Sequence, residues 1–357
     1  MTSLIEPVIA RAVARRLAGD ASLKSSYLME RLERDLAITV PQSEVLVAET
    51  SGIPAPPPVR WGVIDRGSWA EANIDGMTTL LAPLAERIDK RLEAAPPGVR
   101  LAQKGVVSAE VGVLLGYVSR RVLGQYDLLV PEDDAASGNG VPGGRGPLLF
   151  VGPNIVETER RFSFVPREFA LWVSLHEVTH RFQFAGVPWL RERFFTLVRS
   201  YMDGTDLDAS KLVARLRVAG ARLISRRTPP EEKNPMYLLA SPEQRAALDE
   251  LQALMAVVEG HGNYVMDGAG AGAIPSFRRM RRVFEARRQQ AGAVQRVLHH
   301  VIGLEMKFRQ YELGQRFCDA VTGAEGPAVL HHLWADPANM PSLRELREPR
   351  RWLVRVA

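Results

Sequence analysis

The chain has 357 residues, which is enough for one large domain or for two. Hydrophobic residues make up 46% of it and charged residues 24%, a balance typical of folded globular proteins and not of disordered or fibrous ones. The formal net charge of +5 is small for this length and gives little reason to expect a polyanionic partner. A single cysteine, Cys318, excludes a disulfide within the chain and a zinc site built from cysteines.

The first residues predict a pair of helices. Apolar residues recur at helical spacing over 3–18 with arginines between them, and we expect an amphipathic helix there, not a signal peptide. A second helix is expected over 22–38, and Pro41 is expected to close it. The chain has no run of 18 apolar residues, so we expect no membrane span and a cytoplasmic location.

The next part of the chain alternates between a connector, helices and strands. The proline-rich segment 51–62 favours extended backbone. Apolar residues at helical spacing predict helices over 69–94 and 103–124. Apolar runs at 126–130 and 148–154 predict strands that can pair with each other.

Residues 131–147 have the composition of a flexible loop. This loop contains Gly138-x-Gly140-x-x-Gly143, a superficial match to a dinucleotide-binding motif. That motif requires a strand before it and a helix directly after it. An acidic run precedes it here and an apolar strand-like segment follows, so we interpret it as an ordinary loop.

From Pro166 onward the pattern is helical again. Helices are expected over 166–184, 188–203, 207–224, 242–267, 276–290, 293–301 and 303–321. The helix at 242 has a clear start, because Ser241 can cap it and Gln244 completes a capping box. We therefore predict a mainly α fold (α+β), with a small sheet beside the helix at 166–184. Its expected parts are an N-terminal helical region (1–100), a core (101–325) and a C-terminal helical tail (326–357), which can all form one domain.

The segment LWVSLHEVTHRFQFA carries the pattern His176-Glu177-x-x-His180 on a predicted helix. Residues four apart share a helical face, so both imidazoles can reach one ion, and the adjacent carboxylate can take a proton from metal-bound water. The flanking residues are apolar, and histidines buried among them are costly unless they are paired or bind a metal. We expect one zinc ion per chain, with Glu177 as the general base. The alternative is an amphipathic helix with two core histidines.

A catalytic zinc usually has three protein ligands, so a third must come from elsewhere in the chain. The segment VVEGHGNYVMD offers Glu259 and His261, which lie about 200° apart around a helix and cannot easily face one ion together. We favour Glu259 as the ligand, with Asn263 one turn later placed to hydrogen-bond a histidine ligand. His261 as the third ligand is the alternative.

The HEVTH pattern with a distant glutamate on a second helix resembles the gluzincin branch of the zincin metallopeptidases. This resemblance implies His176, His180 and Glu259 as zinc ligands and Glu177 as the base. Asn263 stands where that branch often has an aspartate. The chain also resembles a bacterial family of zinc-dependent metallopeptidases of unknown substrate, some of which are associated with deazaflavin cofactor biosynthesis. The matching segments are RVLGQYDLLV, LFVGPNI, SLHEVTHRFQF, VVEGHGNYVMD and GLEMKFRQYELGQRF.

Together these features predict a zinc-dependent hydrolase, with a metallopeptidase as the favoured activity. A zinc amidohydrolase acting on a small molecule and a non-catalytic zinc-binding scaffold are the alternatives. Tyr311 and Arg309 are candidates to stabilise an oxyanion, although a purely structural helix is the commoner explanation for such residues. The arginine-rich segment 277–290 is interpreted as a solvated face, so we expect a peptide or small amide as substrate and neither nucleic acid nor membrane as partner. The sequence leaves the oligomeric state open.

Overall fold

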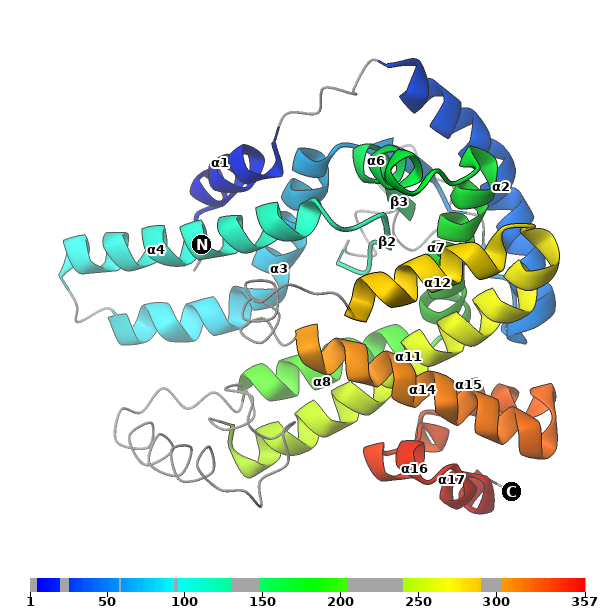
Figure 1. Cartoon of the computed structure of the whole chain (residues 1–357). Helices are drawn as coiled ribbons and strands as arrows, with labels where there is room; N and C mark the ends of the chain where they lie inside the picture. The colour runs from blue at the N-terminus through cyan, green and yellow to red at the C-terminus, as the bar shows by residue number, and fades with distance from the viewer. Residues whose placement is uncertain are drawn as a thin grey trace. The chain divides into compact units, whose positions relative to one another are not determined.

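The computed structural model describes residues 5–19, 26–57, 59–92, 96–129, 148–203, 240–289 and 304–356. The protein is mainly helical and contains a small sheet, as the sequence predicts (Figure 1). The helices are α1 (Pro7–Ala18), α2 (Tyr27–Ser51), α3 (Arg66–Leu92), α4 (Pro97–Ser119), α6 (Gly152–Phe162), α7 (Pro166–Gly186), α8 (Leu190–Asp203), α11 (Pro242–Ala273), α12 (Phe277–Gln289), α14 (Leu304–Glu325), the 3₁₀ helix η2 (Pro327–Leu330), α15 (His331–Ala335), the 3₁₀ helix η3 (Pro337–Asn339), α16 (Leu343–Arg347) and α17 (Pro349–Val356). The strands are β1 (Trp61–Ile64), β2 (Gly124–Tyr126) and β3 (Leu148–Val151). The helices predicted over 207–224 and 293–301, and the loop 131–147, lie outside the described residues.

The chain divides into two compact units. Unit 1 comprises Met1–Leu46, Pro56–Arg181 and Ile274–Ser276, and unit 2 comprises Val47–Ala55, Phe182–Ala273 and Phe277–Ala357. The division falls within the unbroken helix α7, directly after Arg181. The domain boundaries near residues 100 and 325 stay a prediction.

The sheet of unit 1 has the order β1-β3-β2, with β1 parallel and β2 antiparallel to β3. The predicted pairing of two neighbouring strands is confirmed, with Tyr126 opposite Leu148. The bounds predicted for the earlier strand are wrong, because β2 covers Gly124–Tyr126 and shares only Tyr126 with the predicted range 126–130. Strand β1 was not predicted; it begins at Trp61, where the proline-rich segment ends. The last predicted strand was expected to reach residue 154, whereas β3 ends at Val151 because α6 begins at Gly152, with Pro153 in its first turn, where proline is tolerated.

Helix α2 corrects the prediction that Pro41 ends the second helix. The helix continues through Pro41 to Ser51. A proline inside a helix removes one backbone hydrogen bond, but tertiary packing can offset that loss. One face of the helix before Pro41 is buried, with Leu36 and Val40 at 0% and 3% exposure. The buried hydroxyls of Thr39 and Ser174 also lie 3.1 Å apart, which links α2 to α7.

Helices α1, α3 and α4 pack together in unit 1, and Figure 1 shows α1 lying along α4. Small residues allow this close contact, because a Cβ at Gly112 would lie 2.6 Å from the carbonyl oxygen of Ala10. Among the described residues, one stretch, Gly98–Ser119 in α4, is apolar and long enough to cross a membrane, and 22% of its best window is buried. This criterion considers only the length and the composition of a helix, and core helices of globular proteins also satisfy it.

Helices α8, α11 and α14 form the centre of unit 2, with α14 lying against α11 in Figure 1. The predicted start of α11 is confirmed: Ser241 Oγ accepts from the Gln244 backbone N–H, and Gln244 Oε1 accepts from the Ser241 N–H at 2.9 Å. The backbones of α11 and α14 meet at two glycines, since a Cβ at Gly260 would lie 2.1 Å from the carbonyl carbon of Gly314. Neither position has room for a side chain.

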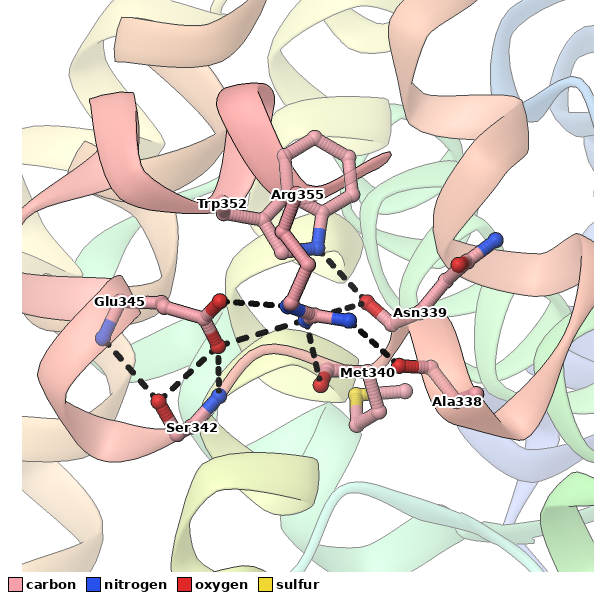
Figure 2. A network of polar contacts seen from close by, with 7 residues as sticks. All are labelled: Ala338, Asn339, Met340, Ser342, Glu345, Trp352 and Arg355. Atoms are coloured by element: carbon pink, nitrogen blue, oxygen red, sulfur yellow. Dashed lines mark hydrogen bonds and ion pairs between the residues drawn. The ribbon is translucent and has the colours of Figure 1, made fainter. Parts of the chain in front are cut away.

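A polar network in unit 2 fixes the last helices of the chain (Figure 2). Arg355 donates to the Glu345 carboxylate and to the Ala338 carbonyl, each at 2.6 Å. The Trp352 indole N–H donates to the Asn339 carbonyl at 2.6 Å. Ser342 and Glu345 form a capping box at the start of α16. These bonds tie α17 to the turns that precede α16.

Candidate metal site

Helix α7 places two imidazoles one turn apart on one face. The Nε2 atoms of His176 and His180 lie 3.2 Å apart, and both side chains are half-buried. A tetrahedral zinc ion with Zn–N bonds of 2.0–2.1 Å separates two ligand nitrogens by about 3.3 Å. The two nitrogens therefore have the spacing that one zinc ion requires.

Glu259 of α11 completes a cluster with these histidines. One ligand atom from each of His176, His180 and Glu259 lies within 4.8 Å of the other two. Glu259 is 5% exposed, and a carboxylate this deeply buried is costly without a cationic or hydrogen-bonding partner. Two imidazoles and one carboxylate are a ligand set found in catalytic zinc sites. The donor set thus fits zinc, and binding of the ion itself stays a prediction.

Gln183, one turn after His180 on α7, fixes this helix against α11 within unit 2. Its side-chain amide donates to the Val258 carbonyl at 2.7 Å, beside Glu259 in the chain. The bond therefore joins the residue three positions after His180 to the residue directly before Glu259. Gln183 was not among the predicted site residues, because nothing in the HExxH pattern specifies that position.

His261, the alternative ligand, has other partners. Its Nδ1 lies 3.1 Å from the Gln183 amide nitrogen, and its Nε2 lies 3.3 Å from the Ser51 carbonyl. The amide donates to Nδ1, so the partners assign the neutral tautomer with the proton on Nε2. The ring is fully buried and makes an edge contact with Trp334. The structure therefore brings Glu259, and not His261, to the two imidazoles.

Glu177 lies against the first residue of β2. A Cβ built at Gly124 would lie 2.6 Å from Cγ, 2.8 Å from Cδ and 2.9 Å from Oε1 of Glu177. The glutamate side chain is 5% exposed and occupies the space that the missing side chain leaves. Gly124 is thus a residue of the site that the sequence analysis missed. A glycine within a strand often marks a close approach of another group, but the predicted strand began at residue 126 and left Gly124 outside it.

Arg181 anchors α7 directly beside His180. Its guanidinium is almost fully buried and donates to Glu44 at 2.6 Å, and to the carbonyls of Pro56 and Pro57 at 2.9 and 2.5 Å. Burial lowers the pKa of Arg181, and the negative charge of Glu44 opposes that shift. The proline-rich segment therefore has a function in the fold, because its carbonyls hold the histidine-bearing helix.

The remaining predicted residues lie on α11 and α14. Asn263 is half-buried one turn after Glu259, and its bond to a histidine ligand stays a prediction. Asp267, one turn further, accepts from Gln315 at 2.9 Å, and burial raises the pKa of its carboxyl. Tyr311 and Arg309 lie in α14, and their side chains are outside the described part of the chain.

The comparisons with known proteins agree with this geometry. Residues 5–353 match the family model of zincin-like metallopeptidases. A crystal structure from Chloroflexus aurantiacus, provisionally assigned as a hydrolase with a novel fold, is 32% identical and superposes with a TM-score of 0.71. The match covers 98% of each chain. A comparison with curated proteins gives no significant match. The chain belongs to the family of zincin-like metallopeptidases.

Proposed function

We propose that the protein is a zinc-dependent peptidase whose metal is held by His176, His180 and Glu259. The observation that carries this proposal is the cluster of two imidazoles and a buried carboxylate on α7 and α11. When bound, zinc supplies a Lewis acid that polarises a carbonyl and lowers the pKa of a water to about 7.

Glu177 is the general base in this proposal. It follows His176 directly on α7 and lies outside the three-residue cluster, so the proposal gives it no role as a metal ligand. It takes a proton from the attacking water and gives it to the leaving amine. The Glu177 side chain occupies the space that Gly124 leaves open, so its carboxylate lies beside the first residue of β2.

The position of β2 supports a peptide as substrate over a small amide. In the sheet order β1-β3-β2, this strand is an edge strand among the described residues. Its first residue, Gly124, touches Glu177. An extended peptide can add to a sheet edge through main-chain hydrogen bonds, and such an addition here would carry the peptide past the proposed base.

The test uses the zinc-loaded full-length protein and a mixed peptide library, with products identified by mass spectrometry. We expect internal cleavage that Glu177→Gln abolishes while zinc content is unchanged, because the residue is a base and not a ligand. Cleavage of small amides but of no peptide would favour the amidohydrolase alternative. Zinc bound without any hydrolysis would favour the scaffold alternative, and equal turnover in Glu177→Gln would exclude the proposed base.

A further inference from the structure

Helix α4 carries a row of exposed valines. Val99, Val106 and Val113 are 53%, 57% and 49% exposed and lie seven residues apart. Ala102 and Ala109 lie between them on the same face, the former exposed and the latter half-buried. These five residues, named here the valine face, form an apolar stripe along four turns of the helix.

One edge of α4, beside the valine face, is already covered by α1. The backbone N–H of Glu6 donates to Ser108 Oγ at 2.7 Å, and Gly112 and Gly116 lie against the α1 backbone. This packing buries residues about one quarter of a turn from the valine face. In the part of the chain that the structure describes, α4 therefore has one edge packed against α1 and one apolar face whose valines are about half exposed.

The spacing of the valine face is that of a helix–helix seam. Apolar residues that alternate three and four apart keep one stripe facing a partner helix. A bilayer surface instead favours a basic polar rim, but Gln103 and Glu110 border this face, both exposed. The pattern thus fits a helix of similar composition better than it fits lipid.

We propose that the valine face is a homodimer interface, in which α4 packs antiparallel against α4 of a second copy with the two-fold axis near Val106. In this arrangement Gln103 lies beside Glu110 of the second copy, so the amide can donate to the carboxylate twice across the axis. A parallel pairing would instead direct the edge that bears Gln103 and Glu110 toward Gly112 of the second copy, which α1 covers.

Cysteine cross-linking tests the axis. The native Cys318 is fully buried, so a disulfide between two copies of a single-cysteine variant can be attributed to the introduced cysteine. Under diamide, Val106→Cys should give a disulfide-linked dimer. Val99→Cys and Val113→Cys should not, because each would lie about 20 Å from its own copy across the axis. No cross-link in Val106→Cys, or equal cross-linking of all three variants, would overturn the proposal.

Light scattering of the purified full-length chain tests association independently of the axis. We expect twice the monomer mass for the wild type and a monomer for Val106→Lys, with the dimer dissociation constant raised at least about 100-fold. Val354→Lys, at an 82% exposed valine of α17, is the matched control and should remain a dimer. A monomeric wild type would overturn the proposal. If that monomer also floats with anionic phospholipid vesicles in a density gradient, the valine face would be assigned to membrane binding.

Discussion

Replacing Gly124 by alanine should displace the proposed base without touching a metal ligand. The new Cβ would lie 2.6 Å from Cγ of Glu177 and 2.8 Å from its Cδ. Carbon atoms in van der Waals contact lie about 3.5–4.0 Å apart, so one group must move by roughly 1 Å. The backbone of β2 is held by its ladder with β3, so the glutamate side chain is the group that yields.

The size of the effect follows from that displacement. A misplacement of about 1 Å in a catalytic group can reduce the rate by on the order of 100-fold. We therefore expect Gly124→Ala to lower kcat for peptide cleavage by about 10- to 100-fold. The zinc affinity should be unchanged, because Glu177 is not in the ligand cluster.

Steady-state kinetics on a cleaved peptide, with zinc affinity measured by competition against a chelator, checks this prediction. Gly62→Ala is the matched control: the residue lies in β1 of the same sheet, and a Cβ there would meet nothing within 4 Å. Wild-type turnover in Gly124→Ala would refute the placement of the base. Loss of zinc in that variant would show that the substitution acts on the whole site.

Gln183→Leu should weaken zinc binding by about 10- to 100-fold, since it removes the bond that sets α7 against α11, and chelator competition measures the change. Gly314→Ala should lower the free energy of unfolding by about 3 kcal/mol in urea titrations, because its Cβ would lie 1.8 Å from the Ala256 carbonyl oxygen. Partial burial of Glu345 is outweighed by hydrogen bonds from Arg355 and Ser342, so the pKa of its carboxyl is lowered. The stabilisation from this charge is present above the unfolded-state pKa and is lost as pH falls through the folded pKa. Arg355→Gln should accordingly lower the melting temperature at neutral pH, with a difference from wild type that shrinks on acidification in calorimetry.

Local patterns in the sequence predicted much of the helical framework. The start of α11 depends on Ser241 and Gln244 alone, which lie three residues apart, and both predicted bonds are present. The path of α2 through Pro41 could not be predicted in this way. It depends on burial and on a contact between Thr39 and Ser174, which are 135 residues apart in the chain.

The same distinction applies to the site. His176 and His180 are one helical turn apart, so their shared face follows from the sequence. The approach of Glu259 depends on contacts between residues far apart in the chain, such as the bond from Gln183 to Val258, which spans 75 residues. Sequence spacing could rank Glu259 above His261 by helical angle, but it could not show that His261 is engaged elsewhere.

Zinc content of the purified protein, measured by elemental analysis, tests the central claim most directly. One zinc ion per chain should copurify with the wild type and be lost in both His180→Ala and Glu259→Ala. The exposed histidine at His332 provides the matched control, and His332→Ala should keep its zinc. A wild-type protein that binds no zinc, or a Glu259→Ala variant that binds it with undiminished affinity, would contradict the account.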